Sequence, residues 1–220
     1  MINPVNLAKS CKSCLIDLLF PRLKMFKDQM IFETIVTTQA KDGRIHIAHM
    51  GIREDNSLIV LAPFRPSTTL DNVLENGYAV VNYCDDVRIF AGCLTGRRDW
   101  PTVPAEKVPC VRLKSALAHC ELKLERIEEN ELRPRLFCQV MHRVSHSPFR
   151  GFNRAQAAVL EAAILVSRLH MLSWEKIEAE MKYLTIAIDK TAGPRELEAW
   201  GWLVEKINAH RALLAQRNTA

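Results

Sequence analysis

The stretch FRPSTTLDNVLENG, residues 64–77, places one arginine and three hydroxyl side chains directly after an apolar run. Ser67 and Thr68 are typical of a helix start, and Gly77 is typical of a left-handed helix end. A helix N-terminus carries unpaired backbone N–H groups and a positive partial charge, and a guanidinium such as that of Arg65 binds phosphate through two parallel hydrogen bonds. The stretch therefore predicts either a plainly capped helix or a phosphate cradle, and its chemistry alone slightly favours the plain cap.

Strand-like runs flank this stretch on both sides. They alternate in polarity or are rich in β-branched residues, and they cover residues 32–38, 44–52, 57–64, 78–84, 116–127 and 134–146. Turn signals at Lys41-Asp42-Gly43 and Asp55-Asn56 join the first three runs as two hairpins, which indicates an antiparallel sheet. We expect about six short strands in a closed or nearly closed barrel with one small helix.

Two segments inside this region are harder to assign. The run VRIFAGCL, residues 87–94, is interpreted as a fifth strand or as a strand that enters a short helix. Residues 97–109 contain three of the ten prolines and little periodicity. We therefore predict a surface loop or lid there.

The hydrophobic period becomes helical from Phe149 onward. Asn153 is placed to cap a first helix, Ser173 opens a second, and Gly193-Pro194 ends the second and begins a third. The fold class is therefore α+β with a mainly β core and a three-helix tail. The predicted division is an N-terminal extension (1–29), a β-barrel domain (30–148) and a helical subdomain packed on the barrel (149–220).

Composition limits the partners. The net charge is +5 with pI near 8.9, and no dense basic block alternates with aromatic residues, so we expect no nucleic-acid partner. The chain has no run of about eighteen apolar residues, so we expect no membrane span. The seven cysteines include one close pair, Cys11-x-x-Cys14, and are best explained as free thiols in a reducing cytoplasm. Met25 and Met30 are alternative starts.

Several short motifs occur in a fixed order: ETIVTT (33–38), AHMG (48–51), RPSTTLDN (65–72), VVN (80–82) and GFNRA (151–155). This order resembles the FMN-binding split barrels, namely the flavin reductases and pyridoxamine-phosphate-oxidase-like proteins. It is more closely similar to a small uncharacterised split-barrel family of archaea and bacteria. The resemblance covers nearly all of residues 30–210. His49 stands where that family usually has proline.

The resemblance implies FMN as cofactor and a homodimer with the flavin near the interface. It implies that the phosphate is held by Arg65, Ser67, Thr68, Thr69 and Asn72, and that the ring is flanked by Thr37, Thr38, His49, Met50 and Gly51. For the two threonines in the strand, β-propensity alone is the alternative explanation.

The tail and the histidines supply further candidates. Asn153 and Arg154 would reach the flavin of the partner, although capping is the favoured role for Asn153. A metal site on His46, His49, His142 and His146 has weak support because His46 and His49 point to opposite faces of a strand, and we predict no metal. No catalytic residue can be named.

The sequence therefore predicts an FMN-binding flavoprotein of unknown reaction. The resemblance associates it with oxidoreductases of methanopterin-dependent one-carbon metabolism, with a redox partner that is a small molecule of unknown identity. The alternative is a non-enzymatic module that keeps the barrel without redox activity. A nucleic-acid-binding barrel is the third hypothesis, and the charge distribution argues against it.

Overall fold

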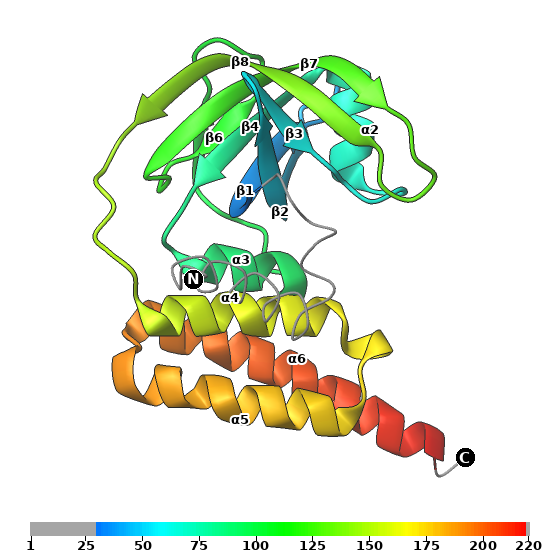
Figure 1. Cartoon of the computed structure of the whole chain (residues 1–220), viewed down its shortest axis with the longest axis vertical. Helices are drawn as coiled ribbons and strands as arrows, with labels where there is room; N and C mark the ends of the chain where they lie inside the picture. The colour runs from blue at the N-terminus through cyan, green and yellow to red at the C-terminus, as the bar shows by residue number, and fades with distance from the viewer. Residues whose placement is uncertain (1–29, 219–220) are drawn as a thin grey trace, which may run out of the picture.

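The structure, a computed structural model, describes residues 30–218. A β-barrel lies on one side and a layer of helices on the other (Figure 1). The predicted N-terminal extension, the alternative starts and the Cys11-x-x-Cys14 pair lie outside the described residues.

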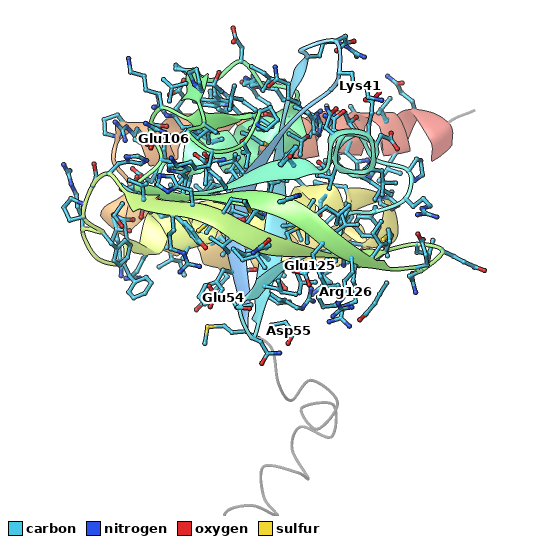
Figure 2. All side chains as sticks on the ribbon, turned by 90° about the horizontal axis from the view of Figure 1, so that it is seen from above. Lys41, Glu54, Asp55, Glu106, Glu125 and Arg126 are labelled. Atoms are coloured by element: carbon cyan, nitrogen blue, oxygen red, sulfur yellow. The ribbon has the colours of Figure 1, made fainter. Side chains whose placement is uncertain are left out.

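Six strands form a closed antiparallel barrel in the order β1-β2-β3-β8-β7-β4. Their bounds are β1 Ile31–Gln39, β2 Ile45–Asp55, β3 Leu58–Leu61, β4 Tyr78–Tyr83, β7 Ala118–Glu128 and β8 Arg135–Ser145. β1 closes the barrel by pairing with both β2 and β4. In the view from above, β7 and β8 run side by side across the barrel, and Glu54 and Asp55 mark the turn that follows β2 (Figure 2). The predicted barrel is confirmed.

Helix α2 (Thr68–Asn76) connects β3 to β4. Ser67 caps it by accepting a hydrogen bond from the backbone N–H of Leu70, and Gly77 ends it with a φ of 78°. The side chains of Leu70 and Val73 are buried in the barrel core. At its far end, Asn76 donates to the carbonyl of Gln39, so α2 is fastened to the end of β1.

The segment interpreted as a fifth strand, or as a strand that enters a short helix, is helical throughout and forms α3 (Val87–Thr95). Asp86 accepts from the backbone N–H of Arg88 and caps it, and Gly96 ends it in the left-handed conformation. Because VRIFAGCL is apolar on nearly every side, its period did not reveal the helix. The reason for this composition is that α3 packs between two cores: Ile89 and Phe90 face the barrel side, whereas Val87 and Ala91 face the helical side.

The predicted loop at residues 97–109 is only partly irregular. Its middle contains β5 (Thr102–Pro104), which pairs with β6 (Val111–Leu113) in a separate two-stranded sheet. Pro104 lies at the last position of this short edge strand, where its missing N–H costs little.

The C-terminal helices are α4 (Arg154–Ser167), the 3-10 helix η3 (Leu169–Met171), α5 (Trp174–Thr191) and α6 (Pro194–Asn218). As predicted, Asn153 caps α4 and Ser173 caps α5. Three tryptophans, Trp174, Trp200 and Trp202, pack against the helical core. No helix within residues 30–218 is long and apolar enough to cross a membrane.

Replacing Gly92 by alanine is expected to lower the free energy of unfolding by about 2 kcal/mol, because the new methyl group has no room. An added Cβ would lie 2.5 Å from the backbone oxygen of Arg97 and 3.2 Å from the Trp100 ring. The control is Gly201→Ala in α6, where nothing lies within 4 Å of the added atom, and where we expect a gain of up to about 1 kcal/mol. Urea unfolding of both variants measures the difference; equal stabilities would refute the steric explanation.

Candidate functional site

The loop that enters α2 forms a cationic corner, defined here as Arg65, Ser67, Thr68 and Arg133. Arg65 and Thr68 are exposed, and the backbone N–H of Arg65 donates to the carbonyl of Leu132. This bond brings the loop beside Arg133, which donates twice to the carbonyl of Ala62 at 3.2 and 3.0 Å. Sequence reasoning missed Arg133, because nothing in its own neighbourhood signals that it returns to the loop after β3.

Among residues 30–218, the charge of Arg65 is paired with Glu129. Its Nη2 lies 3.0 Å from Glu129 Oε2, and both side chains are largely exposed. Exposed pairs of this kind contribute little to stability and exchange partners readily. The guanidinium therefore stays available to a stronger anion.

Four other residues predicted to hold the phosphate or flank the ring are buried inside the protein. The amide of Asn72 donates to Thr38 Oγ1 at 2.9 Å, and both side chains are buried. Thr37 Oγ1 donates to the carbonyl of Val111. Thr69 is also buried, at 2% exposure. These contacts fasten α2 and β6 to β1, so the role of these four side chains in holding FMN stays a prediction.

The predicted ring-flanking segment of β2 is divided between two faces. The side chain of Met50 packs against the barrel core. His49 lies on the outer face, where its Nε2 is 2.6 Å from Glu33 Oε2 and its ring meets Phe90 edge-on at 5.1 Å. The hydrogen bond from His49 lowers the pKa of Glu33. A Cβ on Gly51 would lie 2.7 Å from Ile31 Cγ2, so that side chain covers the glycine.

A large cavity lies between the barrel and the helices and has a volume of about 1010 Å³. Aromatic rings dominate its wall: Phe32, Tyr83, Phe90, Phe149 and Phe152. Its polar lining includes Glu33, Asp85, His146, Asn153, Arg154 and Gln156. A cavity of this size and character is typical of a small-molecule site.

This cavity contains two of the predicted residues, Asn153 and Arg154. Asn153 Oδ1 is occupied by capping α4, and its amide donates to the carbonyl of Thr191. The cavity reaches Glu33 near the start of β1, whereas α2 is bonded to Thr38 near its end. Five strand residues span about 17 Å, so one chain does not bring the cationic corner and the cavity together.

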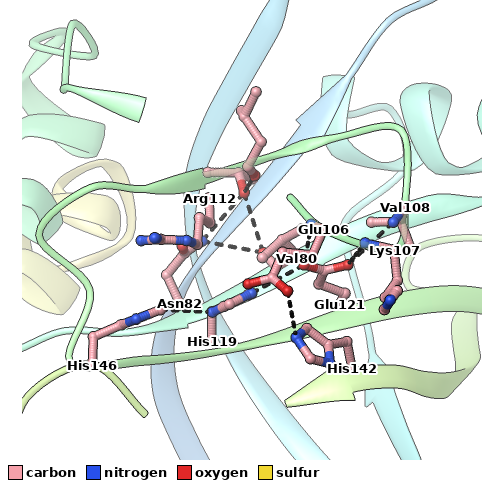
Figure 3. A network of polar contacts seen from close by, with 12 residues as sticks. Val80, Asn82, Glu106, Lys107, Val108, Arg112, His119, Glu121, His142 and His146 are labelled. Carbon is pink, nitrogen blue, oxygen red and sulfur yellow. Dashed lines mark hydrogen bonds and ion pairs between the residues drawn. The ribbon is translucent and has the colours of Figure 1, made fainter. Parts of the chain in front are cut away.

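A buried polar network lies beside the cavity (Figure 3). The carboxylate of Glu121 accepts from the backbone N–H groups of Glu106, Lys107 and Val108 at 2.6, 2.6 and 3.1 Å. His119 Nε2 lies 3.1 Å from the same carboxylate, and His119 Nδ1 lies 2.9 Å from His146 Nε2. Both Glu121 and His119 are fully buried in β7. The sequence did contain a signal for this network. His119 and Glu121 are two positions apart, so they share one face of a strand that begins with mostly apolar residues.

The charge state of this network follows from its hydrogen bonds. Burial works against an ionised Glu121, but the bonds from the backbone of Glu106 and Lys107 and from His119 outweigh it and lower its pKa. Burial, followed by the positive charge of Arg112, lowers the pKa of His146. Glu121 is therefore an anion at neutral pH, and His146 is a neutral imidazole.

His142 lies next to the network without completing it. Its Nε2 is buried and lies 3.3 Å from Glu106 Oε2, but the contact lacks hydrogen-bond geometry. The two atoms are therefore close without forming a hydrogen bond, because distance alone does not make one. Within residues 30–218, no group of three or more acidic, histidine or cysteine side chains could hold a metal ion.

The five described cysteines are free, and four of them are buried. Cys84 lines the cavity, where burial and the negative charges of Asp85 and Asp86 raise its pKa to about 12. A protonated thiol is a poor nucleophile. Cys84 is therefore better explained as a structural residue than as a nucleophile.

The arrangement of strands and tail defines the class of protein: a split β-barrel with an appended helical layer. Two family profiles match the chain, "Protein of unknown function (DUF447) N-terminal domain" at residues 32–147 and "Protein of unknown function (DUF447)" at residues 153–205. The chain belongs to the DUF447 family. The predicted resemblance to split-barrel proteins is thereby confirmed.

Two solved structures illustrate the relationship. An FMN-bound DUF447 protein from Methanosarcina mazei is 20% identical, with a TM-score of 0.69 over 84% of this chain and 99% of that chain. A 2-nitrobenzoate 2-nitroreductase from Pseudomonas fluorescens is also 20% identical, with a TM-score of 0.47 over 61% of this chain and 75% of that chain. The first match establishes a shared fold. Among curated proteins, none matches the chain.

Proposed function

We propose that the protein is an FMN-binding flavoprotein that acts as an oxidoreductase. The cationic corner is the observation that carries the proposal: a guanidinium with only an exposed partner lies beside the N-terminus of α2. The M. mazei protein of the same family, which shares the fold, is FMN-bound. For this chain, the link to methanopterin-dependent one-carbon metabolism and the cytoplasmic location stay predictions from sequence.

The residues present fit the phosphate end of FMN. Ser67 accepts the backbone N–H of Leu70, which leaves N–H groups of the first helical turn for an anion. Arg65 gives up only an exposed ion pair when it turns to a phosphate, and Arg133 adds a second positive charge beside the loop. Bound FMN would supply the redox chemistry, and the protein would supply binding and orientation.

We also propose that the functional unit is a homodimer. The cationic corner and the residues Asn153 and Arg154 lie toward opposite ends of β1. One flavin meets both groups only if the second group belongs to another copy of the chain. Gel filtration with light scattering tests this, and a stable monomer that binds FMN normally would refute it.

Replacing Arg65 by alanine is expected to weaken FMN binding about 10-fold, because a charge-assisted hydrogen bond to the phosphate is lost. Titration of flavin fluorescence measures the dissociation constant. Stability should change by less than about 0.5 kcal/mol, since the broken pair with Glu129 is exposed. The matched control is Arg168→Ala, an exposed arginine at the end of α4, which should leave FMN affinity unchanged. Equal affinities of the two variants would contradict the proposal.

One observation favours a second candidate function, a barrel that binds no flavin. Thr38 and Asn72 are already hydrogen-bonded to one another, and the side chain of Ile31 covers Gly51. A non-enzymatic module would keep such contacts. It would purify without colour and would not acquire flavin absorbance when FMN is added.

A further inference from the structure

The aromatic cavity and the buried network meet at one residue, His146. Its side chain lines the cavity, and its Nε2 is joined to His119. We propose that this cavity is a separate binding site for a planar aromatic molecule that carries a hydroxyl group, and that His146 Nδ1 accepts a hydrogen bond from the hydroxyl. The proposal goes beyond flavin binding. It rests on the cavity and the network, and it requires that a flavin reaching Asn153 and Arg154 leaves the part of the cavity beside His146 free.

The cavity walls suit a flat apolar ring. Phe90 and Phe32 contribute from the barrel side, and the linker to α4 contributes Phe149 and Phe152, whose rings meet edge-on at 5.2 Å. Phe152 is fully exposed in the free chain, and Phe149 is 57% exposed. Exposed aromatic rings at the rim of a concave apolar site are stabilised when a ligand removes them from water.

The hydrogen bonds of the network decide which nitrogen of His146 remains for a ligand. Because Glu121 is an anion, the Nε2 of His119 must carry a hydrogen to donate to it. A neutral His119 then accepts at Nδ1, so His146 donates from Nε2. The two rings are nearly parallel, at 5°, which keeps this pairing. The remaining nitrogen, His146 Nδ1, carries a lone pair and is a proton acceptor.

The network also gives a proton somewhere to go. If Nδ1 of His146 takes up a proton, its Nε2 proton lies on the hydrogen bond to His119 Nδ1, whose ring in turn contacts the Glu121 carboxylate. A buried ion pair is favourable only with good hydrogen bonds, and Glu121 has three from the backbone. A hydrogen-bond donor that does not titrate would be enough at position 146 if its only role were to bind His119 Nδ1.

The sign of the pH dependence follows from the surroundings. The charged and titratable groups that face His146 or share its cavity are Arg112, His119, Glu106, Arg154, Asp85 and Glu33. Burial and Arg112 lower the pKa of His146, so Nδ1 stays free at neutral pH. A phenol keeps its proton there. Acidification protonates His146, removes the acceptor and weakens binding.

The test uses the whole chain and the fluorescent phenol 2-naphthol as probe. The wild-type protein should bind it, and the affinity should fall about five-fold as pH drops from about 8 to about 5, the loss of one hydrogen bond. His146→Gln retains a donor for His119 but does not titrate, so its affinity should be low and independent of pH. The control His170→Gln, at an exposed histidine in η3, should behave as wild type.

A second pair of variants tests the place of binding. Ala157→Trp fills the cavity from α4 and should abolish binding, whereas Ala179→Trp on the exposed face of α5 should not. Absence of binding to wild type, or an unchanged pH profile in His146→Gln, would overturn the proposal. Displacement of 2-naphthol by FMN would show that the cavity is the flavin's own site and would also overturn it, whereas simultaneous binding supports two sites.

Discussion

Replacing Glu121 by glutamine is expected to lower the free energy of unfolding by about 3 kcal/mol. Each carboxylate oxygen accepts two hydrogen bonds: Oε1 from Glu106 and His119, Oε2 from Lys107 and Val108. Glutamine has the same shape but only one oxygen. Its amide nitrogen would face two N–H donors, which leaves buried donors unsatisfied.

The same residue should make stability depend on pH. The pKa of Glu121 is lowered from its ordinary value of 4.5 in the folded chain, so its contribution is present above 4.5 and is lost as pH falls through the folded value. The difference in stability between wild type and Glu121→Gln should therefore shrink in acid. Urea unfolding at several pH values measures it.

Glu125→Gln on the same strand is the matched control. Glu125 is exposed, and its side chain is labelled on the outside of the barrel in Figure 2. Its replacement should change stability by less than about 0.5 kcal/mol. If both variants lower the free energy of unfolding by the same small amount, the buried carboxylate does not hold the segment of residues 105–110 as described.

Replacing Asn82 by aspartate should cost at least about 3 kcal/mol at neutral pH, for the opposite reason. The amide nitrogen of Asn82 donates to the carbonyls of Ile35 and Val80 and to Thr37 Oγ1. Its oxygen accepts from the backbone N–H of Leu113 at 2.7 Å. Aspartate would place a charged oxygen against three acceptors at a site with no solvent exposure.

The matched control here is Asn130→Asp. Asn130 is exposed and uses only its oxygen, which accepts from the backbone of Leu132 and Arg133. Aspartate keeps that role, so stability should stay within about 0.5 kcal/mol of wild type. Thermal unfolding of the two variants tests the contrast. An Asn82→Asp protein as stable as the control would mean that Asn82 is not the link between β1, β4 and β6.

Local patterns predicted most of the fold. Alternation and turn residues such as Lys41-Asp42-Gly43 gave the hairpins, and Asn153 and Ser173 gave the helix starts. The pattern of residues 87–94 did not indicate a helix. A helix that is buried on two sides has no polar face, and helical periodicity is recognised from the contrast between a polar and an apolar face.

The candidate site was less accessible from sequence. Arg65 and Thr68 were found at the surface beside the start of α2. Thr38 and Asn72 were found bonded to one another, which no single segment could show. Likewise His119 meets His146 only because β7 and β8 fold back on each other. Contacts between residues far apart in the chain are set by tertiary packing.

Helix α3 has a consequence for cooperativity. Ile89 and Phe90 pack with Ile35 and Ile47 of the barrel strands, while Val87 and Ala91 belong to the helical core, so α3 joins the packing of the two parts. Removal of the helices after the barrel would expose one side of α3 to water. We therefore expect the two parts of the chain to unfold in a single transition, although the family profiles divide them into two regions.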